Sequence, residues 1–216
     1  MNTGIFGGTF NPIHYGHLRA CEEVAELMPL DKVIFIPSNI TSNKKETVIN
    51  TQKRLEMVKI ATEDNSKFEV SDIEISRGGI SFFYDTLREL TSIYRKDNFF
   101  FIIGTDAFSG IKNWKNSESL FNTNMTNFIV MNRNAHEKNL LNLAEYLPDR
   151  IKETAGMDIK NSRIVLSGNK YIYFLNVTRM DISSTKIRNN FKMNRSNLYL
   201  LPKKLIDYII CNRLYL

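Results

Sequence analysis

The chain has 216 residues, 43% of them hydrophobic, and its formal net charge is +6 at pH 7. This length and apolar content suit one sizeable core, so we expect a single domain over residues 1–216 and exclude two separate catalytic units. The positive charge favours anionic partners. Because Lys and Arg are scattered along the chain, nucleotides fit that charge at least as well as nucleic acid does.

The two cysteines and the hydropathy of the chain indicate where in the cell the protein works. Cys21 and Cys211 lie far apart in apolar helical patterns, which indicates buried thiols rather than a disulfide or a metal site. No apolar run approaches the length of a membrane span, and the N-terminal residues lack a signal-peptide pattern. We therefore expect a cytoplasmic protein that binds no membrane and no nucleic acid. The oligomeric state stays open, a homo-oligomer included.

Strand and helix patterns alternate along the chain. Apolar runs predict strands at Thr3–Gly7, Lys32–Pro37, Phe68–Val70, Asn98–Gly104, Asn127–Met131 and Tyr171–Asn176. Helical patterns lie at Tyr15–Leu27, Thr51–Thr62, Ser81–Tyr94 and His136–Tyr146. This alternation predicts an α/β fold: a Rossmann-like, doubly wound parallel sheet with helices on both faces. Ligands of such sheets bind at the carboxyl ends of strands where the strand order reverses, here at Gly7–Gly8 and Gly104–Asp106.

The last third of the chain departs from this alternation. Pro148, Gly156 and Gly168 interrupt residues 134–168, which we interpret as a surface insertion with a helix or two. Beyond Ser183, two helical patterns predict a C-terminal helical segment that packs back on the sheet.

Residues 4–18 combine a strand end, a glycine turn and a helix start. Gly7 and Gly8 permit a tight turn, and His14 and His17 share one side of the first helical turn. Backbone N–H groups there can hold a phosphate, and the imidazoles can donate hydrogen bonds to it. The alternative is that the histidines only cap the helix, but the glycine turn in front of them favours the phosphate site. The GxGxxG fingerprint is absent, which disfavours a hydride-transfer enzyme.

A second phosphate-type pattern covers residues 181–188, where Ser and Thr hydroxyls open a helix. An N-cap at Asp181 or Ser183 would explain the hydroxyls alone. It does not explain Lys186 and Arg188 in the first turn, where the helix dipole disfavours cations unless an anion compensates them. This pattern therefore also favours an anionic ligand.

Together the two patterns resemble those of the HxGH nucleotidyltransferases, specifically the bacterial nicotinate-nucleotide adenylyltransferases. The family's opening, GGTFDPIHxGHL, is present as residues 7–18 with Asn11 in place of the usual Asp, and its ISSTxIR motif is present letter for letter as residues 182–188. Further matches lie between them, at residues 70–75, 77–81, 85–87 and 102–106 and at Trp114.

The resemblance implies adenylyl transfer from ATP to nicotinate mononucleotide, which gives nicotinate adenine dinucleotide and pyrophosphate in NAD biosynthesis. It implies catalytic roles for His14, His17 and Arg188. The ATP-binding residues it implies are Gly7, Gly8, Thr9, Phe10, His14, His17, Asp106, Ile182, Ser183, Ser184, Thr185 and Arg188. The mononucleotide-binding residues it implies are Thr9, Lys44, Lys45, Phe82, Phe83, Asp106 and Trp114.

Two departures from the family pattern concern the acceptor. The family's PPHK-like segment reads Ile40–Lys45 here, so either Lys44 or Lys45 is left to keep its cationic role, and a merely solvated loop is the alternative. Phe82–Phe83 stands where the family often has Tyr-Thr, which keeps an aromatic wall and removes a small polar contact. Nicotinate and nicotinamide mononucleotide are therefore not distinguished by the sequence.

Single residues also admit structural interpretations. Asp106 can bind a nucleotide ribose or cap a short helix, and Trp114 can stack on the nicotinate ring or anchor the core. Mg²⁺ is expected on the ATP phosphates, and the sequence contributes no dense carboxylate cluster, which such an ion does not need. No protein metal site is predicted.

Three other functions compete with this interpretation. The same chemistry could act on nicotinamide mononucleotide or phosphopantetheine, and a non-catalytic nucleotide-binding sensor or RNA-binding module could keep the sheet and the positive charge. A mere sensor has no need to keep both histidines and the 182–188 motif. A class I aminoacyl-tRNA synthetase is disfavoured because the chain has no room for an anticodon-binding domain and no KMSKS-like segment.

Overall fold

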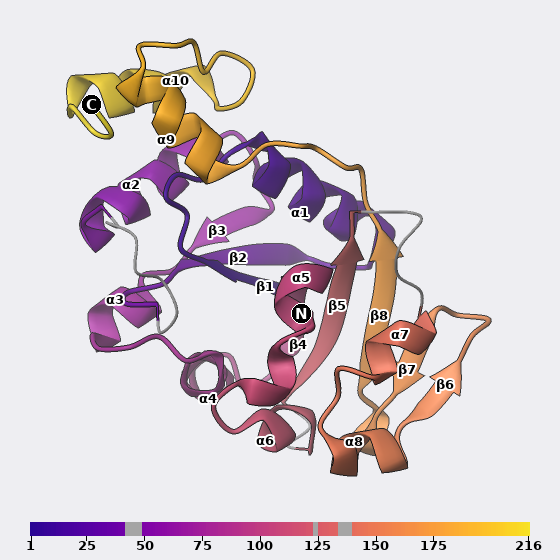
Figure 1. Cartoon of the computed structure of the whole chain (residues 1–216). Helices are drawn as coiled ribbons and strands as arrows, with labels where there is room; N and C mark the ends of the chain where they lie inside the picture. Colours follow the sequence, from indigo (N-terminus) through magenta and orange to yellow (C-terminus); the bar gives the residue numbers. More distant parts are fainter. Residues whose placement is uncertain (42–48, 123–124, 134–139) are drawn as a thin grey trace.

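The computed structural model describes residues 1–41, 49–122, 125–133 and 140–216. Its centre is one eight-stranded sheet (Figure 1). The strands are β1 Asn2–Gly8, β2 Lys32–Pro37, β3 Phe68–Val70, β4 Asn98–Gly104, β5 Thr126–Asn132, β6 Gly156–Asp158, β7 Arg163–Val165 and β8 Tyr171–Asn176. Their spatial order is β3-β2-β1-β4-β5-β8-β7-β6.

The six strands from β3 to β8 in this order run parallel, and only β7 and β6 are antiparallel to their neighbours. The chain builds outward from β1 through β2 to β3 and then returns to the other side of β1 with β4. The strand order therefore reverses between β1 and β4, which pair through Asn2–Ile5 and Asn98–Phe101. This confirms the predicted doubly wound sheet and its reversal point.

Helices cover both faces of the sheet (Figure 1). The α-helices are α1 Tyr15–Leu27, α2 Thr51–Thr62, α3 Ile73–Arg77, α4 Phe83–Ile93, α5 Thr105–Phe108, α6 Ser117–Asn122, α7 Leu140–Ala144, α8 Asp149–Thr154, α9 Ser184–Lys192 and α10 Lys203–Cys211. Two short 3₁₀ helices are η1 Ile111–Asn113 and η2 Ser167–Asn169. Helices α1, α2, α9 and α10 lie on one face, and α4, α6 and α8 on the other.

The core has two halves because successive strand residues point to opposite faces of a sheet. In β1, Ile5 packs in the half below α4 and α6, whereas Phe6 packs in the half below α1 and α2. The central strands are apolar on both faces, as expected for parallel strands covered on both sides. The continuous run Phe99–Ile103 in β4 is entirely buried.

Residues 134–168, which we interpret from the sequence as a surface insertion, contribute to the edge of the sheet. Residues 134–139 lie outside the described part, so the predicted helix from His136 is visible only as α7. A second helix, α8, follows, and then β6 and β7 extend the sheet as an antiparallel pair next to β8. The sequence did not predict these strands, because each is short and lies in a segment that Pro148, Gly156 and Gly168 interrupt.

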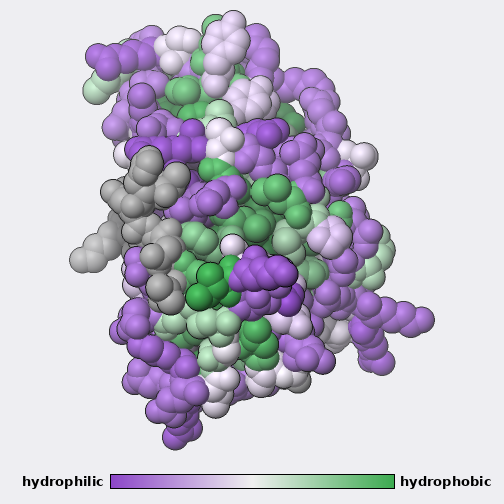
Figure 2. Space-filling view, turned by 90° about the vertical axis from the view of Figure 1, so that its right-hand side faces the viewer, coloured by the Kyte–Doolittle hydropathy of each residue, from purple (hydrophilic) through white to green (hydrophobic). Residues whose placement is uncertain are grey.

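One face of the molecule is largely polar. Figure 2 shows hydrophilic side chains over most of one face, around a patch of apolar side chains at mid-height. Within the described ranges, no helix combines the length and apolar character needed to cross a bilayer.

Candidate active site

A cavity of about 870 Å³ lies at the carboxyl ends of β1 and β4, where the strand order reverses. This volume falls within the range of small-ligand sites, roughly 300–1,000 Å³. The residues around it are Phe6, Gly7, Gly8, Thr9, Phe10, Asn11, His14, His17, Asp106, Ala107, Arg133, Ile182, Ser183, Ser184, Thr185 and Arg188. Every residue that the resemblance implied for ATP binding is among them. The structure thus brings the two phosphate-type patterns to one cavity.

Gly7 and Gly8 are the last residues of β1 and neither has a positive φ, so the turn predicted at these glycines lies beyond them, at residues 9–12, which we call the glycine turn. A Cβ atom added to Gly8 would lie 2.9 Å from the Phe10 ring, whereas one added to Gly7 would meet no atom within 4 Å. Phe10 itself has a φ of 47°, a left-handed conformation that L-residues other than Gly, Asn and Asp rarely adopt. Its ring packs edge-on against His17 at a centroid distance of 5.4 Å. The turn is therefore held in one shape by aromatic packing.

Three carbonyl oxygens, of this turn and of Gly8 before it, accept hydrogen bonds from distant parts of the chain. The Ser38 N–H, just beyond β2, donates to the Gly8 carbonyl at 2.9 Å. Arg188 Nη1 donates to the Asn11 carbonyl at 3.0 Å. The Ser184 hydroxyl donates to the Pro12 carbonyl at 2.8 Å. The first turn of α9 is thereby attached to the segment that leads into α1.

The two histidines form a stacked pair at the start of α1. Their ring centroids lie 3.7 Å apart with an interplanar angle of 24°. His14 is the N-cap of α1, and its N–H donates to His17 Nδ1 at 3.3 Å. Since His17 Nδ1 accepts this bond, the ring proton of His17 lies on Nε2. The histidines therefore do both things: they cap α1, and both rings line the cavity.

His14 is neutral at pH 7. Burial, assisted by the positive charge of Arg133, lowers the pKa of His14 to about 4. Its Nδ1 is buried without a hydrogen-bond partner among the described residues, next to the position that a Cβ of Gly16 would take. Nε2 is left as the nitrogen that a ligand in the cavity can reach. A neutral imidazole can donate one hydrogen bond there without carrying charge.

Helix α9 opens as a capped helix directed at the cavity. Ser183 is its N-cap, and its hydroxyl accepts the N–H of Lys186 at 3.2 Å. The alternative cap, Asp181, instead pairs with Arg179 at 2.8 Å. The Lys186 side chain is exposed and does not line the cavity, unlike Arg188. Of the two first-turn cations, the structure therefore brings only Arg188 to the glycine turn.

Arg133 is a cavity residue that sequence analysis missed. It directly follows β5, and its Nε is buried without a hydrogen-bond partner among the described residues. The rule that ligands bind at the carboxyl ends of strands, applied to β5 as well as to β1 and β4, would have identified it. An unpaired buried guanidinium nitrogen beside His14 suits an anionic ligand.

The aromatic residues implied for the mononucleotide lie apart from the residues that line the cavity. Phe83 stacks on Phe101 at 3.6 Å, and Trp114 meets the Phe83 ring edge at 6.4 Å. The Phe82 ring faces Lys115 Nζ at 4.8 Å. Trp114 is half-buried and packs against the core, as expected for a core anchor.

Four other residues are implied for mononucleotide binding. Two of them line the cavity, and two lie outside the residues that the structure describes. Thr9 and Asp106 line the cavity. Asp106 lies in the first turn of α5, of which Gly104 is the N-cap, and a Cβ at Gly104 would come within 2.5 Å of the Asp106 carboxylate. Lys44 and Lys45 lie outside the described residues.

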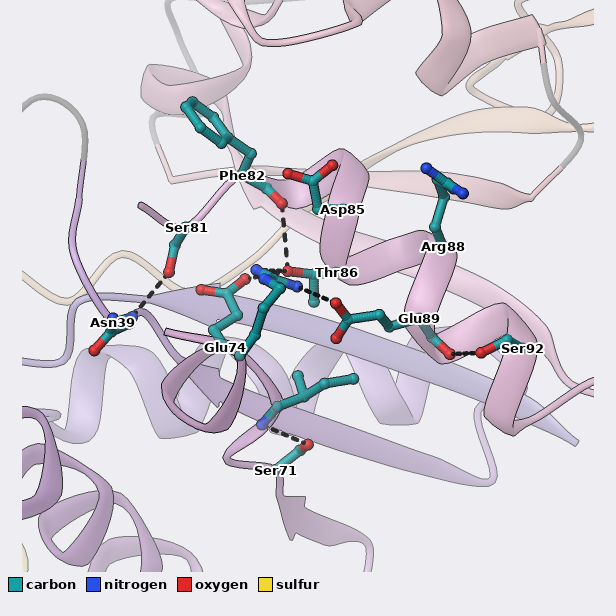
Figure 3. Close-up of polar contacts among 12 residues, drawn as sticks. Asn39, Ser71, Glu74, Ser81, Phe82, Asp85, Thr86, Arg88, Glu89 and Ser92 are labelled. Carbon is teal, nitrogen blue, oxygen red and sulfur yellow. Dashed lines mark hydrogen bonds and ion pairs between the residues drawn. The ribbon is translucent and has the colours of Figure 1, made fainter. Parts of the chain in front are cut away.

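A polar network fixes the start of α4, next to Phe82 and Phe83 (Figure 3). The buried Thr86 hydroxyl donates to Glu74 at 2.6 Å and accepts from Arg77 at 3.0 Å. It also lies 3.3 Å from the Phe82 carbonyl. The aromatic wall is therefore connected to α3 through buried hydrogen bonds.

Comparisons with known proteins agree on one family. A family profile described as cytidylyltransferase-like matches residues 5–190. The chain is 41% identical over 216 residues to a probable nicotinate-nucleotide adenylyltransferase of Citrifermentans bemidjiense, which covers 100% of this chain and 98% of that relative. A protein of the same name from Dictyoglomus thermophilum is 36% identical and covers 100% of both chains.

Solved structures share the fold. The Plasmodium falciparum nicotinic acid mononucleotide adenylyltransferase complexed with NaAD has a TM-score of 0.74 at 21% identity, covering 99% of this chain and 97% of that chain. The same enzyme complexed with APC has a TM-score of 0.73 at 20% identity, covering 99% of this chain and 96% of that chain.

Proposed function

The chain belongs to the nicotinate-nucleotide adenylyltransferases, within the cytidylyltransferase-like family, and on this premise we propose that it transfers the adenylyl group of ATP to nicotinate mononucleotide. The products are nicotinate adenine dinucleotide and pyrophosphate, and the activity belongs to NAD biosynthesis. The observation that supports this most directly is the convergence of two distant motifs, in which Ser184 and Arg188 donate to the carbonyls of Pro12 and Asn11.

The reaction needs no covalent enzyme intermediate. The phosphate of the mononucleotide attacks the α-phosphorus of ATP in line, a new P–O bond forms, and the bond to the β-phosphate oxygen breaks to release pyrophosphate. Such a reaction depends on positioning and on stabilisation of charge, and well-aligned reactants can lower the barrier by roughly 7–11 kcal/mol. The neutral His14 fits a hydrogen-bond donor role rather than that of a proton-transferring acid.

We assign the phosphates of ATP to the cavity between the two motifs. His14 and His17 would donate to them from the start of α1, while Ser184, Thr185 and Arg188 would bind them from the start of α9. Charge that develops on the departing pyrophosphate is then met by a guanidinium and by preorganised donors, which is the usual way in which enzymes stabilise such a transition state. His14, His17 and Arg188 are the proposed catalytic residues.

The mononucleotide would occupy the side of the cavity towards α4. Thr9 and Asp106 line the cavity, and Asp106 would accept hydrogen bonds from ribose hydroxyls. Phe82, Phe83 and Trp114 would supply an aromatic wall for the pyridine ring. Lys44 and Lys45 remain proposed contacts for the acceptor.

Mg²⁺ would enter with ATP. Among the described residues, no group of three or more His, Cys, Asp or Glu side chains could hold a metal, and Asp106 is the carboxylate that lines the cavity. This fits Mg²⁺, which keeps several waters and is bound largely through substrate phosphates. When bound, the ion neutralises phosphate charge, and Asp106 is the residue available to hold its water shell.

The experiment that tests this function measures pyrophosphate release from Mg-ATP with three acceptors in parallel: nicotinate mononucleotide, nicotinamide mononucleotide and phosphopantetheine. We expect nicotinate mononucleotide to give the highest kcat/KM and a reaction without acceptor to give no release. A higher value with another acceptor would reassign the substrate. No release with any acceptor would favour a nucleotide sensor instead.

A further inference from the structure

Arg54 is the largest side chain of the described residues that is fully buried, with 0% of its surface exposed. It lies in the first turns of α2, and burial lowers its pKa. An arginine nevertheless stays protonated in proteins, so a whole positive charge lies inside the core. A buried charge is costly unless it is paired and hydrogen-bonded, and its presence needs an explanation.

Backbone carbonyls supply the partners of this guanidinium. Nη1 donates to the Thr9 carbonyl at 2.7 Å, and Nη2 donates to the carbonyls of Ser38 at 2.6 Å and Asn39 at 2.9 Å. Nε donates to the Ile49 carbonyl at 3.1 Å. In the part of the chain that the structure describes, no carboxylate forms an ion pair with Arg54. Each of its three nitrogens donates at least one hydrogen bond, and the negative charge of Glu74 acts on it only through space.

The carbonyls that Arg54 binds belong to segments at the ends of two neighbouring strands. Thr9 belongs to the glycine turn after β1, while Ser38 and Asn39 follow the carboxyl end of β2. A single side chain therefore fixes the two strand ends relative to each other and to α2. The fork of the guanidinium suits this task because its N–H groups point in fixed directions.

The bond to Thr9 also sets the direction of the next amide. In a trans peptide the C=O and the following N–H point in opposite directions, so a Thr9 carbonyl turned towards Arg54 turns the Phe10 N–H away from it. That N–H donates to none of the described residues. Phe10 is only 3% exposed, lines the cavity and has a φ of 47°. A buried amide without a partner is rare in proteins and suits a ligand that accepts its hydrogen bond.

We propose that Arg54 is a positioning residue that holds the Thr9–Phe10 peptide so that the Phe10 N–H binds a phosphate in the cavity. Its positive charge, which forms no ion pair among the described residues, adds to the attraction for that phosphate. Arg54 does not touch the substrate and acts through the peptide that it orients. The proposal rests on the proposed function, because it assumes that phosphates occupy this cavity.

The test compares charge-matched variants of neighbouring residues. Arg54→Met and Lys53→Met each remove one positive charge from α2, but Lys53 is half-exposed and donates to Asn212 and not to a carbonyl of the turn. We expect Arg54→Met to weaken binding of Mg-ATP and of inorganic pyrophosphate at least ten-fold by calorimetry, Arg54→Lys to give an intermediate loss, and Lys53→Met to stay within two-fold. A folded Arg54→Met variant that binds pyrophosphate within two-fold of the unaltered protein would overturn the proposal.

A second measurement uses the unaltered protein and does not depend on whether Arg54 variants fold. With ¹⁵N-labelled phenylalanine, the Phe10 amide resonance should move downfield when Mg-ATP or pyrophosphate is added, as expected for a new hydrogen bond to an anion. A Phe10 amide that does not move while either probe binds would contradict the proposal. Both readouts measure binding, so absent turnover with intact phosphate binding would refute only the proposed function.

Discussion

The hydroxyl of Tyr215 donates a hydrogen bond to Asn11 Oδ1 at 2.7 Å, although the two residues lie 204 positions apart in the sequence. Asn11 is buried in the glycine turn, and Tyr215 is the penultimate residue of the chain. Burial, partly offset by Arg188 and Arg54, raises the pKa of Tyr215, so its hydroxyl stays a donor throughout the physiological range. The turn at the cavity is thus connected to the extreme C-terminus.

Removing this hydroxyl leaves the buried Asn11 oxygen without its donor. We expect Tyr215→Phe to lower the free energy of unfolding by about 1–2 kcal/mol, the usual cost of an unsatisfied buried acceptor. Urea denaturation measures it. Tyr199→Phe is the matched control, because Tyr199 is an exposed tyrosine of the same C-terminal segment and its loss of a hydroxyl should cost nothing measurable. Equal effects of the two substitutions would contradict the role of the Tyr215 contact.

The stability of the protein should fall as the pH decreases from 6.5 to 4, in part through His14. Its pKa is about 4 in the folded protein and about 6.5 in the unfolded chain. Between these values the unfolded chain binds more protons, so its free energy falls relative to that of the folded state. Linkage gives a loss of about 2 kcal/mol at pH 5 relative to neutral pH. Urea denaturation of the unaltered protein and of His14→Gln at pH 5 and pH 7.5 measures it, and parallel losses in both proteins would be inconsistent with this assignment.

Gly8→Ala should destabilise the glycine turn. The added Cβ would lie 2.9 Å from the buried Phe10 ring, so the ring or the backbone has to shift, and such overpacking typically costs about 1–3 kcal/mol. Gly7→Ala is the control for stability, because its Cβ meets no atom within 4 Å and the residue lies in the strand β1. Thermal unfolding should therefore separate the two variants. A Gly8→Ala protein as stable as Gly7→Ala would show that the turn adapts freely.

Thr86→Val should affect the acceptor more than ATP. The substitution removes the hydroxyl that bridges Glu74 and Arg77 at the start of α4, where it leaves buried polar groups unpaired at a cost of about 1–3 kcal/mol. We expect the KM for nicotinate mononucleotide to rise several-fold while the KM for ATP stays within two-fold. Thr86→Ser, which keeps the hydroxyl, should leave the KM for nicotinate mononucleotide close to that of the unaltered protein. Thr91→Val on the same helix removes only an exposed bond to the Arg88 carbonyl and is the control. A larger change in the KM for ATP would argue against a link to the acceptor wall.

His17→Ala should reduce kcat by about 10²–10³, the range found when a preorganised transition-state donor is removed. His17 lies at the cavity and stacks on His14, and it also packs against the Phe10 ring edge-on and against the Phe6 ring at a tilt. The variant should therefore remain folded by circular dichroism. Glu26→Ala is the control on α1, since the Glu26 side chain is exposed and pairs only loosely with Arg19 at 3.8 Å. Near-normal turnover of a folded His17→Ala protein would remove His17 from the catalytic residues.

Much of the fold could be predicted because its signals are local. The central strands are apolar runs bounded by turns, and four strands, at Lys32–Pro37, Phe68–Val70, Asn98–Gly104 and Tyr171–Asn176, have the predicted limits. The helices α1 and α2 likewise begin and end where their periodic patterns do. The strands β6 and β7 could not be predicted, because they lie at the sheet edge in a segment that Pro148, Gly156 and Gly168 interrupt, and because their conformation depends on the pairing of β6 with β7 and of β7 with β8.

The site was predictable to the extent that each motif is continuous. The residues of the glycine turn and of the 182–188 motif meet at the cavity. Arg133 and Arg54 belong to no motif, and only the folding of the chain places Arg133 at the cavity and Arg54 against Thr9. Lys186 is the converse case, because it belongs to a motif but the rotation of α9 leaves it in solvent. The roles of the proposed contact residues remain predictions that the experiments above address.

The contacts of Ser184, Arg188 and Tyr215 with residues 11 and 12 have a consequence for biosynthesis. Synthesis proceeds from the N-terminus, and domains generally fold as their chain emerges. Until residues 184–215 have emerged from the ribosome, the glycine turn lacks these three contacts, and the cavity lacks the wall that α9 contributes. A nascent chain that stops short of these residues therefore has an incomplete cavity.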